Sequence, residues 1–478
     1  MRRFFAGSGP MLAPQTSGRS GRFARALAEF RTLGALALPI VVTQLAQMGM
    51  GVADAIMAGR VSATDLAGVT LGGNLYWPLM ILMSGIVMAV TPSVSQLRGA
   101  GHVGASGAVV RQALWIAVFG GLVLVLLLRN VEPAYRFLGV DERAIPVATE
   151  YIRAASLGLP LMLAFASLRC LCEGMSWTRP AMFIGLSMLA LKVPLNWLFI
   201  YGNPTLGVPA MGGVGCGWAT AIVMAYAFVA MVLVVSFSRV RASNVFASFS
   251  LPDSREIGRI LRLGLPIGLA LFAETGFFSV ATLLIGRLGV ETVAAHQVAF
   301  NIVGVAFMVP LSLGVAATIR VGFHVGADSL SDARRSAWVA AAMTAIWGIT
   351  LSTILLVWRH DLVALYTEEA EVIRLAAGLL LIGALFQVFD STQATVMGAL
   401  RGYKDTRAPL MIALVAYWVI GLPVGVTLCF GFAGVEAIGI DGIWWGLVTG
   451  LAVVAFALLA RLARISNDPA RVAHMRLR

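Results

Sequence analysis

The segment LALPIVVTQLAQMGMGVADAIMAGR, residues 36–60, returns in altered form as LGLPIGLALFAETGFFSVATLLIGR, residues 263–287. The offset that places Leu38 on Leu265 also places Asn74 on Asn301. Many of the shared residues are Gly, Pro, Asn, Thr and Arg, so a common apolar composition explains the match poorly. Self-similarity at a fixed offset is the mark of an internal repeat. The sequence therefore predicts two related halves.

Long apolar segments make up most of the chain outside these two segments. Of 478 residues, 59% are hydrophobic and 12% are charged, and the mean hydropathy is +0.87. Soluble domains carry about 25% charged residues. A bilayer core about 30 Å thick requires about 20 apolar residues per helix. The sequence thus predicts an all-α membrane protein with about twelve spans, near residues 33–57, 69–96, 108–128, 146–172, 180–201, 213–237, 262–285, 293–322, 336–358, 371–400, 408–430 and 440–462.

The two halves are expected to enter the membrane with the same polarity. Six predicted spans per half is an even number, so the repeats are parallel, with a cleft between two bundles. Such duplicated bundles are suited to alternating access around a central site. The predicted organisation is a flexible basic cytoplasmic arm (1–32), a six-helix lobe (33–237), a cytoplasmic linker (238–261), a second six-helix lobe (262–462) and a cytoplasmic tail (463–478).

The net charge of +12 comes mostly from residues between the apolar segments. With a cytoplasmic N-terminus, most of the 35 Lys and Arg residues fall on the termini and on the connections of that side. This asymmetry is typical of the positive-inside rule. We therefore expect a multi-pass protein of the cell inner membrane with both termini in the cytoplasm. Its basic residues are expected to contact lipid headgroups, and nucleic acid is not an expected partner.

Sequence motifs of catalysis do not accompany the apolar segments. Ser/His pairs and metal-ligand pairs at matching depth are not found, and neither is a phosphate-binding loop of an ATP-driven pump. The four cysteines have the spacing of neither a zinc site nor a disulfide framework, and we interpret them as packing residues. The sequence therefore favours a protein that is not an enzyme and needs no cofactor.

Three carboxylates interrupt the apolar spans, and burying each in a membrane is costly. At 1.5 Å per residue from the side of the termini, Glu274 lies about 18 Å deep and Asp390 about 15 Å deep. Because both belong to the second half, we expect them to share one cavity and to bind Na⁺ or H⁺, since a small cation prefers oxygen ligands. The alternative is a hydrogen bond between helices. Asp54 lies near the outer end of the first span, where an interfacial position is the alternative.

The polar residues of the first half differ from those of the second. At the offset of the repeat, Glu274 falls on Gln47, and Asp54 has no acidic counterpart. Lys192 is the one clear cation inside a span, and it either neutralises Asp54 or extends to an interface. Asn196, one turn later, is interpreted as a residue that joins helices. Gln47 either lines the cleft or packs. We place these four residues in substrate binding or coupling.

Several segments together resemble the multidrug and toxic compound extrusion family, and within it the NorM branch. The resemblance covers residues 33–462 and is carried by the first segment quoted above, together with TPSVSQLRGAG (91–101), VPLNWLFIYG (193–202), GGVGCGWATA (212–221), AAHQVAFN (294–301) and FDSTQATVMGALRGYKD (389–405). It implies a V-shaped fold of two six-helix bundles. It also implies efflux of lipophilic organic cations, such as drugs and dyes, in exchange for Na⁺ or H⁺, and we expect a monomer.

The resemblance also implies roles for the buried acids. By position, Asp54, Glu274 and Asp390 match the acids of the family's spans 1, 7 and 10, and the last two resemble a sodium site. Lys192 departs from the family pattern, in which an uncharged polar residue is expected. The rival function is a lipid-linked oligosaccharide flippase of similar plan, but such a protein should hold more cations in its cleft. A structural scaffold would leave Glu274 and Asp390 unexplained.

Overall fold

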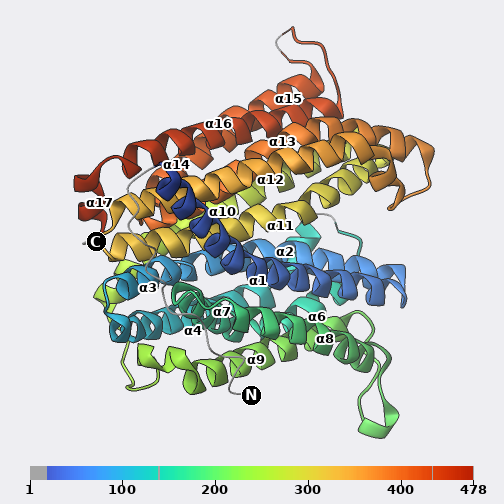
Figure 1. The fold of residues 1–478 in the computed structure, drawn as a ribbon. Helices are drawn as coiled ribbons and strands as arrows, with labels where there is room; N and C mark the ends of the chain where they lie inside the picture. Colours follow the sequence, from blue (N-terminus) through green and yellow to red (C-terminus); the bar gives the residue numbers. More distant parts are fainter. Residues whose placement is uncertain (1–18, 138–139, 433, 477–478) are drawn as a thin grey trace.

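A computed structural model describes residues 19–137, 140–432 and 434–476 of the chain. Within these residues, 11 helices are long and apolar enough to cross a membrane, or up to 12 when one bent pair counts as a single span. Figure 1 shows them as one bundle of helices lying side by side. The prediction of an all-α membrane protein with about twelve spans is confirmed.

The first half runs through the blue and green helices of Figure 1. They are α1 (Arg19–Gly59), α2 (Ala63–Val87) continued by α3 (Val90–Gly99), α4 (Ser106–Arg129), the short α5 (Glu132–Phe137), α6 (Ile145–Ser156), α7 (Leu159–Gly174), α8 (Arg179–Tyr201) and α9 (Val214–Phe237). Helices α6 and α7 are the bent pair, with an angle of 46° between them.

The second half, yellow to red in Figure 1, repeats this order. It comprises α10 (Ser254–Ile285), α11 (Val290–Gly326), α12 (Leu330–Ala364), α13 (Ala370–Gly402), α14 (Arg407–Leu414), a π-helical segment (Val415–Gly421), α15 (Leu422–Phe430), α16 (Ile440–Ser466) and α17 (Pro469–Arg476).

The helices extend beyond three of the predicted boundaries, because hydropathy detects only the apolar part of a helix. The expected flexible arm (1–32) is helical from Arg19 onward, and its residues 1–18 lie outside the described residues. In the expected linker, α10 begins at Ser254, where the Asp253 carboxylate accepts a hydrogen bond from the Arg255 amide and caps the helix. In the expected tail, α16 continues to Ser466. The helices therefore extend beyond the apolar spans.

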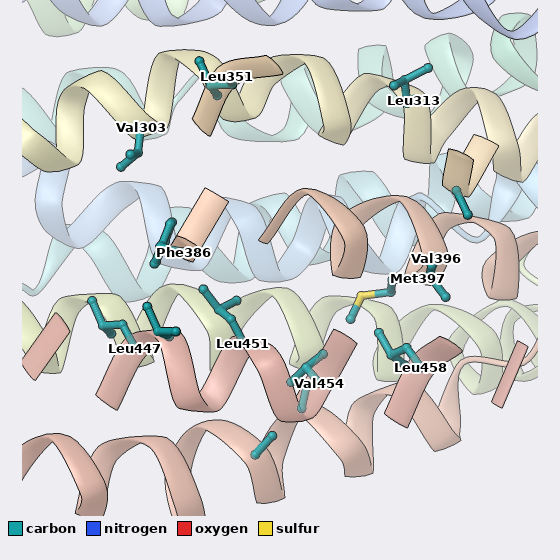
Figure 2. Packing of buried hydrophobic residues seen from close by; sticks show 14 of the residues in the cluster. Val303, Leu313, Leu351, Phe386, Val396, Met397, Leu447, Leu451, Val454 and Leu458 are labelled. Carbon is teal, nitrogen blue, oxygen red and sulfur yellow. The ribbon is translucent and has the colours of Figure 1, made fainter. Parts of the chain in front are cut away.

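Each half has its own apolar core, which gives the molecule two lobes. Figure 2 shows the core of the second lobe, where Leu313 on α11, Leu351 on α12, Phe386 on α13 and Leu451 on α16 lie together. Leu33 at the start of α1 is buried in the same core, although α1 belongs to the first half. The beginning of α1 therefore crosses over α11 and α12, as Figure 1 shows, and links the lobes.

The lobes meet at the end of the bundle where α1 begins and α16 ends, here called the termini end. There α3 packs against α11 at glycines that the repeat makes equivalent: a Cβ on Gly99 would lie 2.0 Å from the Phe323 carbonyl oxygen, and one on Gly326 would lie 2.0 Å from that of Gln96. The Gln96 amide also donates to the Gly402 carbonyl at 3.0 Å. Only glycine permits so close an approach of two backbones.

Candidate ion and substrate site

The second lobe brings together the two acids that the sequence singled out. Glu274 on α10 and Asp390 on α13 are both buried, with 8% and 4% exposure. The Gln393 Nε2 donates to Glu274 Oε1 at 2.6 Å and lies 3.4 Å from Asp390 Oδ1. A single amide nitrogen therefore lies within hydrogen-bond distance of both carboxylates. The predicted proximity of the acids is confirmed.

Neither carboxylate has a cationic side chain within salt-bridge distance among the described residues. The buried Arg401, about three turns beyond Asp390 on α13, attracts Glu274 only at longer range. Both acids instead share one neutral amide donor. Paired buried acids without a fixed counter-charge are costly to keep ionised. The arrangement therefore favours a mobile cation, either a proton or a small metal ion.

A π-helical segment completes the wall of this site. Over Val415–Gly421 the helix widens by one residue per turn, a feature often found at functional sites. It places the Tyr417 ring on Phe277, with centroids 5.0 Å apart and planes 13° apart. It also lets the Trp418 indole Nε1 donate to the Ala273 carbonyl at 3.2 Å, beside Glu274.

Two oxygen atoms of this wall are buried without a hydrogen-bond partner. They are Gln393 Oε1 and the Tyr417 hydroxyl oxygen. Tyr417 is close enough to interact electrostatically with both Glu274 and Asp390. The carboxylate oxygens and these two atoms are all hard oxygen donors, the kind that a small cation prefers. The residues present therefore fit an alkali cation, and a proton fits the carboxylates equally.

Sequence reasoning missed Gln393 and Tyr417. Gln393 follows Asp390 by three residues, so the two side chains share one face of a helix, and that spacing was available as a signal. Tyr417 was not predictable in the same way, because the π-helical segment shifts the register of every side chain after it.

The first lobe holds a different arrangement around Asp54. The Lys192 Nζ forms an ion pair with Asp54 Oδ1 at 3.0 Å, and the Asn196 amide donates to the same oxygen at 2.7 Å. All three side chains are buried. Of the two alternatives for Lys192, the structure shows pairing with Asp54 rather than extension to an interface. Asn196 joins α8 to α1, as expected. Residues of α8 and α9 contact Asp54 and bury it within the protein, whereas its depth in the membrane stays a prediction.

The remaining predicted residues lie apart from both acidic clusters. Gln47 on α1 is half-buried and forms no hydrogen bond with any side chain in the described residues. The four cysteines are free and buried, as packing residues would be. No group of three or more His, Cys, Asp or Glu suited to a metal occurs in the described part of the chain. The acid pair of the second lobe is therefore the strongest candidate site.

Comparison with known proteins accounts for the repeat. A family model described as MatE matches residues 39–198 and again residues 266–427. The two matches begin at Pro39 and Pro266, which are also equivalent in the repeat of the sequence itself. The multidrug resistance protein PmpM of Pseudomonas aeruginosa is 43% identical over 442 residues, which cover 92% of each chain. The multidrug resistance protein MdtK of Yersinia pseudotuberculosis is 39% identical over 445 residues, 93% of this chain and 97% of that protein.

Solved structures share the same two-lobed fold. The eukaryotic MATE transporter AtDTX14 superposes with a TM-score of 0.85 at 21% identity, over 95% of this chain and 99% of that one. The Vibrio cholerae MATE transporter VcmN in its bent form gives 0.82 at 17% identity, over 93% and 99%. At these identities the likeness establishes the V-shaped fold, which agrees with the expectation from sequence.

Proposed function

The chain belongs to the MATE family of membrane transporters, which are not enzymes, and on this premise we propose that it is a secondary antiporter for multidrug efflux. It exports lipophilic organic cations in exchange for Na⁺, with H⁺ as the alternative coupling ion. The relatives PmpM and MdtK are named as multidrug resistance proteins and align over nearly their full length. That likeness supports the substrate class.

The observation that carries the proposal is the buried pair Glu274 and Asp390. The two carboxylates lie within hydrogen-bond distance of one amide nitrogen, that of Gln393, and so offer one patch of negative charge to any cation that reaches it. A small ion and a large organic cation cannot both neutralise the same patch. Binding of one cation at the acid pair therefore weakens binding of the other, and exchange requires this competition.

We place the termini end of the bundle in the cytoplasm of the cell that holds the protein in its inner membrane. The excess of Lys and Arg on the termini and on the connections of that side supports this orientation. The inter-lobe contacts at Gly99 and Gly326 then close the cytoplasmic end. Exchange then requires that in this state a cation reach the acid pair from the outside, where Na⁺ is plentiful.

The transport cycle follows from the competition. In the outward state, Na⁺ binds Glu274 and Asp390 and releases the organic cation. When the lobes reorient, the ion leaves to the cytoplasm and the freed carboxylates attract the next drug. The two states must bind each cation with different affinity, because a ligand that binds both equally shifts nothing. In the state that the structure describes, the amide nitrogen of Gln393 lies within hydrogen-bond distance of both acids.

The first lobe gives no support to the flippase alternative. A protein that carries lipid-linked phosphates needs free cations in its cleft. Lys192, the cation that the sequence places inside a span of this lobe, is paired with Asp54.

The test is efflux of a fluorescent organic cation from right-side-out vesicles, with the Na⁺ and proton gradients set separately. We expect efflux to require one of these gradients and to be lost in Glu274→Gln and in Asp390→Asn. The matched control is Glu371→Gln, which neutralises an exposed acid at the start of α13 and should transport normally. Normal efflux in the double variant Glu274→Gln, Asp390→Asn would remove the proposal. A response to the proton gradient alone would change only the ion.

A further inference from the structure

We infer that Lys192 is a built-in counter-cation that permanently occupies the acid of the first lobe, so that this lobe binds no coupling ion. Ion exchange is then confined to the second lobe. The inference deepens the proposed antiport and rests on it. It concerns how many cations the protein binds and which residues bind them.

The Lys192 ammonium is fully coordinated within the first lobe. An ammonium has three donors, and the structure gives this one three acceptors from two helices. They are Asp54 Oδ1 on α1 at 3.0 Å, the Cys216 carbonyl on α9 at 3.1 Å and the Thr220 hydroxyl on α9. Only 2% of Lys192 is exposed. No donor is left over for a drug, a lipid phosphate or a solvent anion.

One carboxylate oxygen of the partner acid holds both of the printed contacts of this side chain. Asp54 Oδ1 accepts from both Lys192 and Asn196, and the residue is 8% exposed. A mobile cation would have to displace an ammonium tethered only a few bonds from the helix backbone. A tethered group has a high effective concentration at its site. A dissolved ion therefore competes poorly for Asp54.

The two lobes differ in the charge that faces their acids. The first lobe holds one buried carboxylate and the second holds two, and in each lobe a side-chain amide donates a hydrogen bond, that of Asn196 in the first and that of Gln393 in the second. Only the first has a lysine in contact with its acid. The second keeps its two acids without a salt bridge among the described residues. The Lys192 ammonium thus supplies the positive charge that a free cation would otherwise have to supply.

Removing the lysine should convert the first lobe into a cation site. Two side chains, those of Lys192 and Asn196, now contact the Asp54 carboxylate. Without the lysine, only the Asn196 amide would remain as a donor. An uncompensated buried charge costs several kcal/mol, so the carboxylate would bind a cation or take up a proton. Lys192→Asn creates this situation, and Lys192→Arg does not, because it preserves the charge.

The experiment uses the full chain, purified in detergent, in a background of Glu274→Gln and Asp390→Asn that disables the second lobe. Two readouts are taken: binding of radioactive ²²Na⁺, and the infrared band of protonated carboxylic acids. We expect the background to show neither Na⁺ binding nor a carboxylic acid band that depends on Asp54. Adding Lys192→Asn should restore about one cation per molecule, as bound Na⁺ or as a proton on Asp54. Adding Asp54→Asn as well should remove it.

Lys192→Arg in the same background is the matched control and should restore nothing. The inference is overturned if folded Lys192→Asn protein gains no cation, or if the background already binds one at Asp54. The second outcome needs no lysine variant and decides the question even if that variant fails to fold. An unmodified protein that binds neither ion and transports without either gradient would instead contradict the proposed antiport.

Discussion

Glu29, near the start of α1, forms a bidentate ion pair with Arg320 on α11. The pair joins a helix of the first half to a helix of the second. The Arg320 Nε lies 2.8 Å from Glu29 Oε1, and Nη2 lies 2.6 Å from Oε2. The Ser336 hydroxyl on α12 donates to the same carboxylate at 2.7 Å. Three helices are thereby joined at the termini end, beside the close contact of α3 with α11. We call this set of contacts the Glu29 latch.

Glu29→Gln should weaken the closure of the termini end. The variant retains the hydrogen bond from Ser336 but loses an ion pair whose side chains are only 10% and 19% exposed. A loss of about 1.4 kcal/mol changes the ratio of open to closed molecules tenfold. Hydrogen–deuterium exchange of residues 23–35 should become at least about tenfold faster. Glu132→Gln removes an exposed pair, with Arg136, and is the control that should leave this exchange unchanged.

Gln393→Leu should lower the affinity for the coupling ion without abolishing transport. The amide is the common donor to both acids, and residues that orient ligands in this way typically contribute about 10–100-fold in affinity. The ion concentration that gives half-maximal exchange should rise accordingly. Gln387→Leu is the matched control, because that buried amide on the same helix donates to Ser391 and to neither acid. Equal effects of the two substitutions would contradict the role of Gln393.

Tyr417→Phe should leave the protein at least as stable as before in the absence of ions. The hydroxyl is buried without a partner, which costs about 1–3 kcal/mol, whereas the ring packs on Phe277. If the hydroxyl oxygen helps to bind the coupling cation, the rise in unfolding temperature that the cation produces should shrink. Thermal unfolding with and without NaCl measures both. A fall in the ion-free unfolding temperature would show that the hydroxyl has a protein partner instead.

The spans and the acid pair could be predicted because they depend on simple lengths. An apolar helix must match the bilayer, and two acids at similar depth in one lobe have few places to lie. The start of α1 was not predictable in this way. Residues before the apolar part of the first span look like a polar arm, and their contacts with the second lobe, such as those of Glu29 and Leu33, become visible only in the structure.

The polar contacts of each site depend on rotation about the helix axis, which hydropathy does not fix. Lys192 had two possible positions on sequence alone, and its pairing became clear only when α1, α8 and α9 were seen to converge on it. The same limit applies to Tyr417. Its ring stacks on Phe277 from within the segment Val415–Gly421, where the helix widens, and the sequence carries no established signal for that change.

Gly326→Ala should force the lobes apart at the termini end. A Cβ there would lie 2.0 Å from the Gln96 carbonyl oxygen, a distance that real side chains do not adopt, so α3 or α11 must move. The closed state would lose stability, whereas a state in which this end is open would not. Electron-spin distance measurements between labels on the loops after α3 and after α11 should show a larger population at long distance. Gly304→Ala, on the same helix with open space around the new Cβ, should instead stabilise α11 by up to about 1 kcal/mol and leave the distances unchanged. If both alanine variants gave the unmodified distance distribution, the contact of α3 with α11 would not hold this end closed.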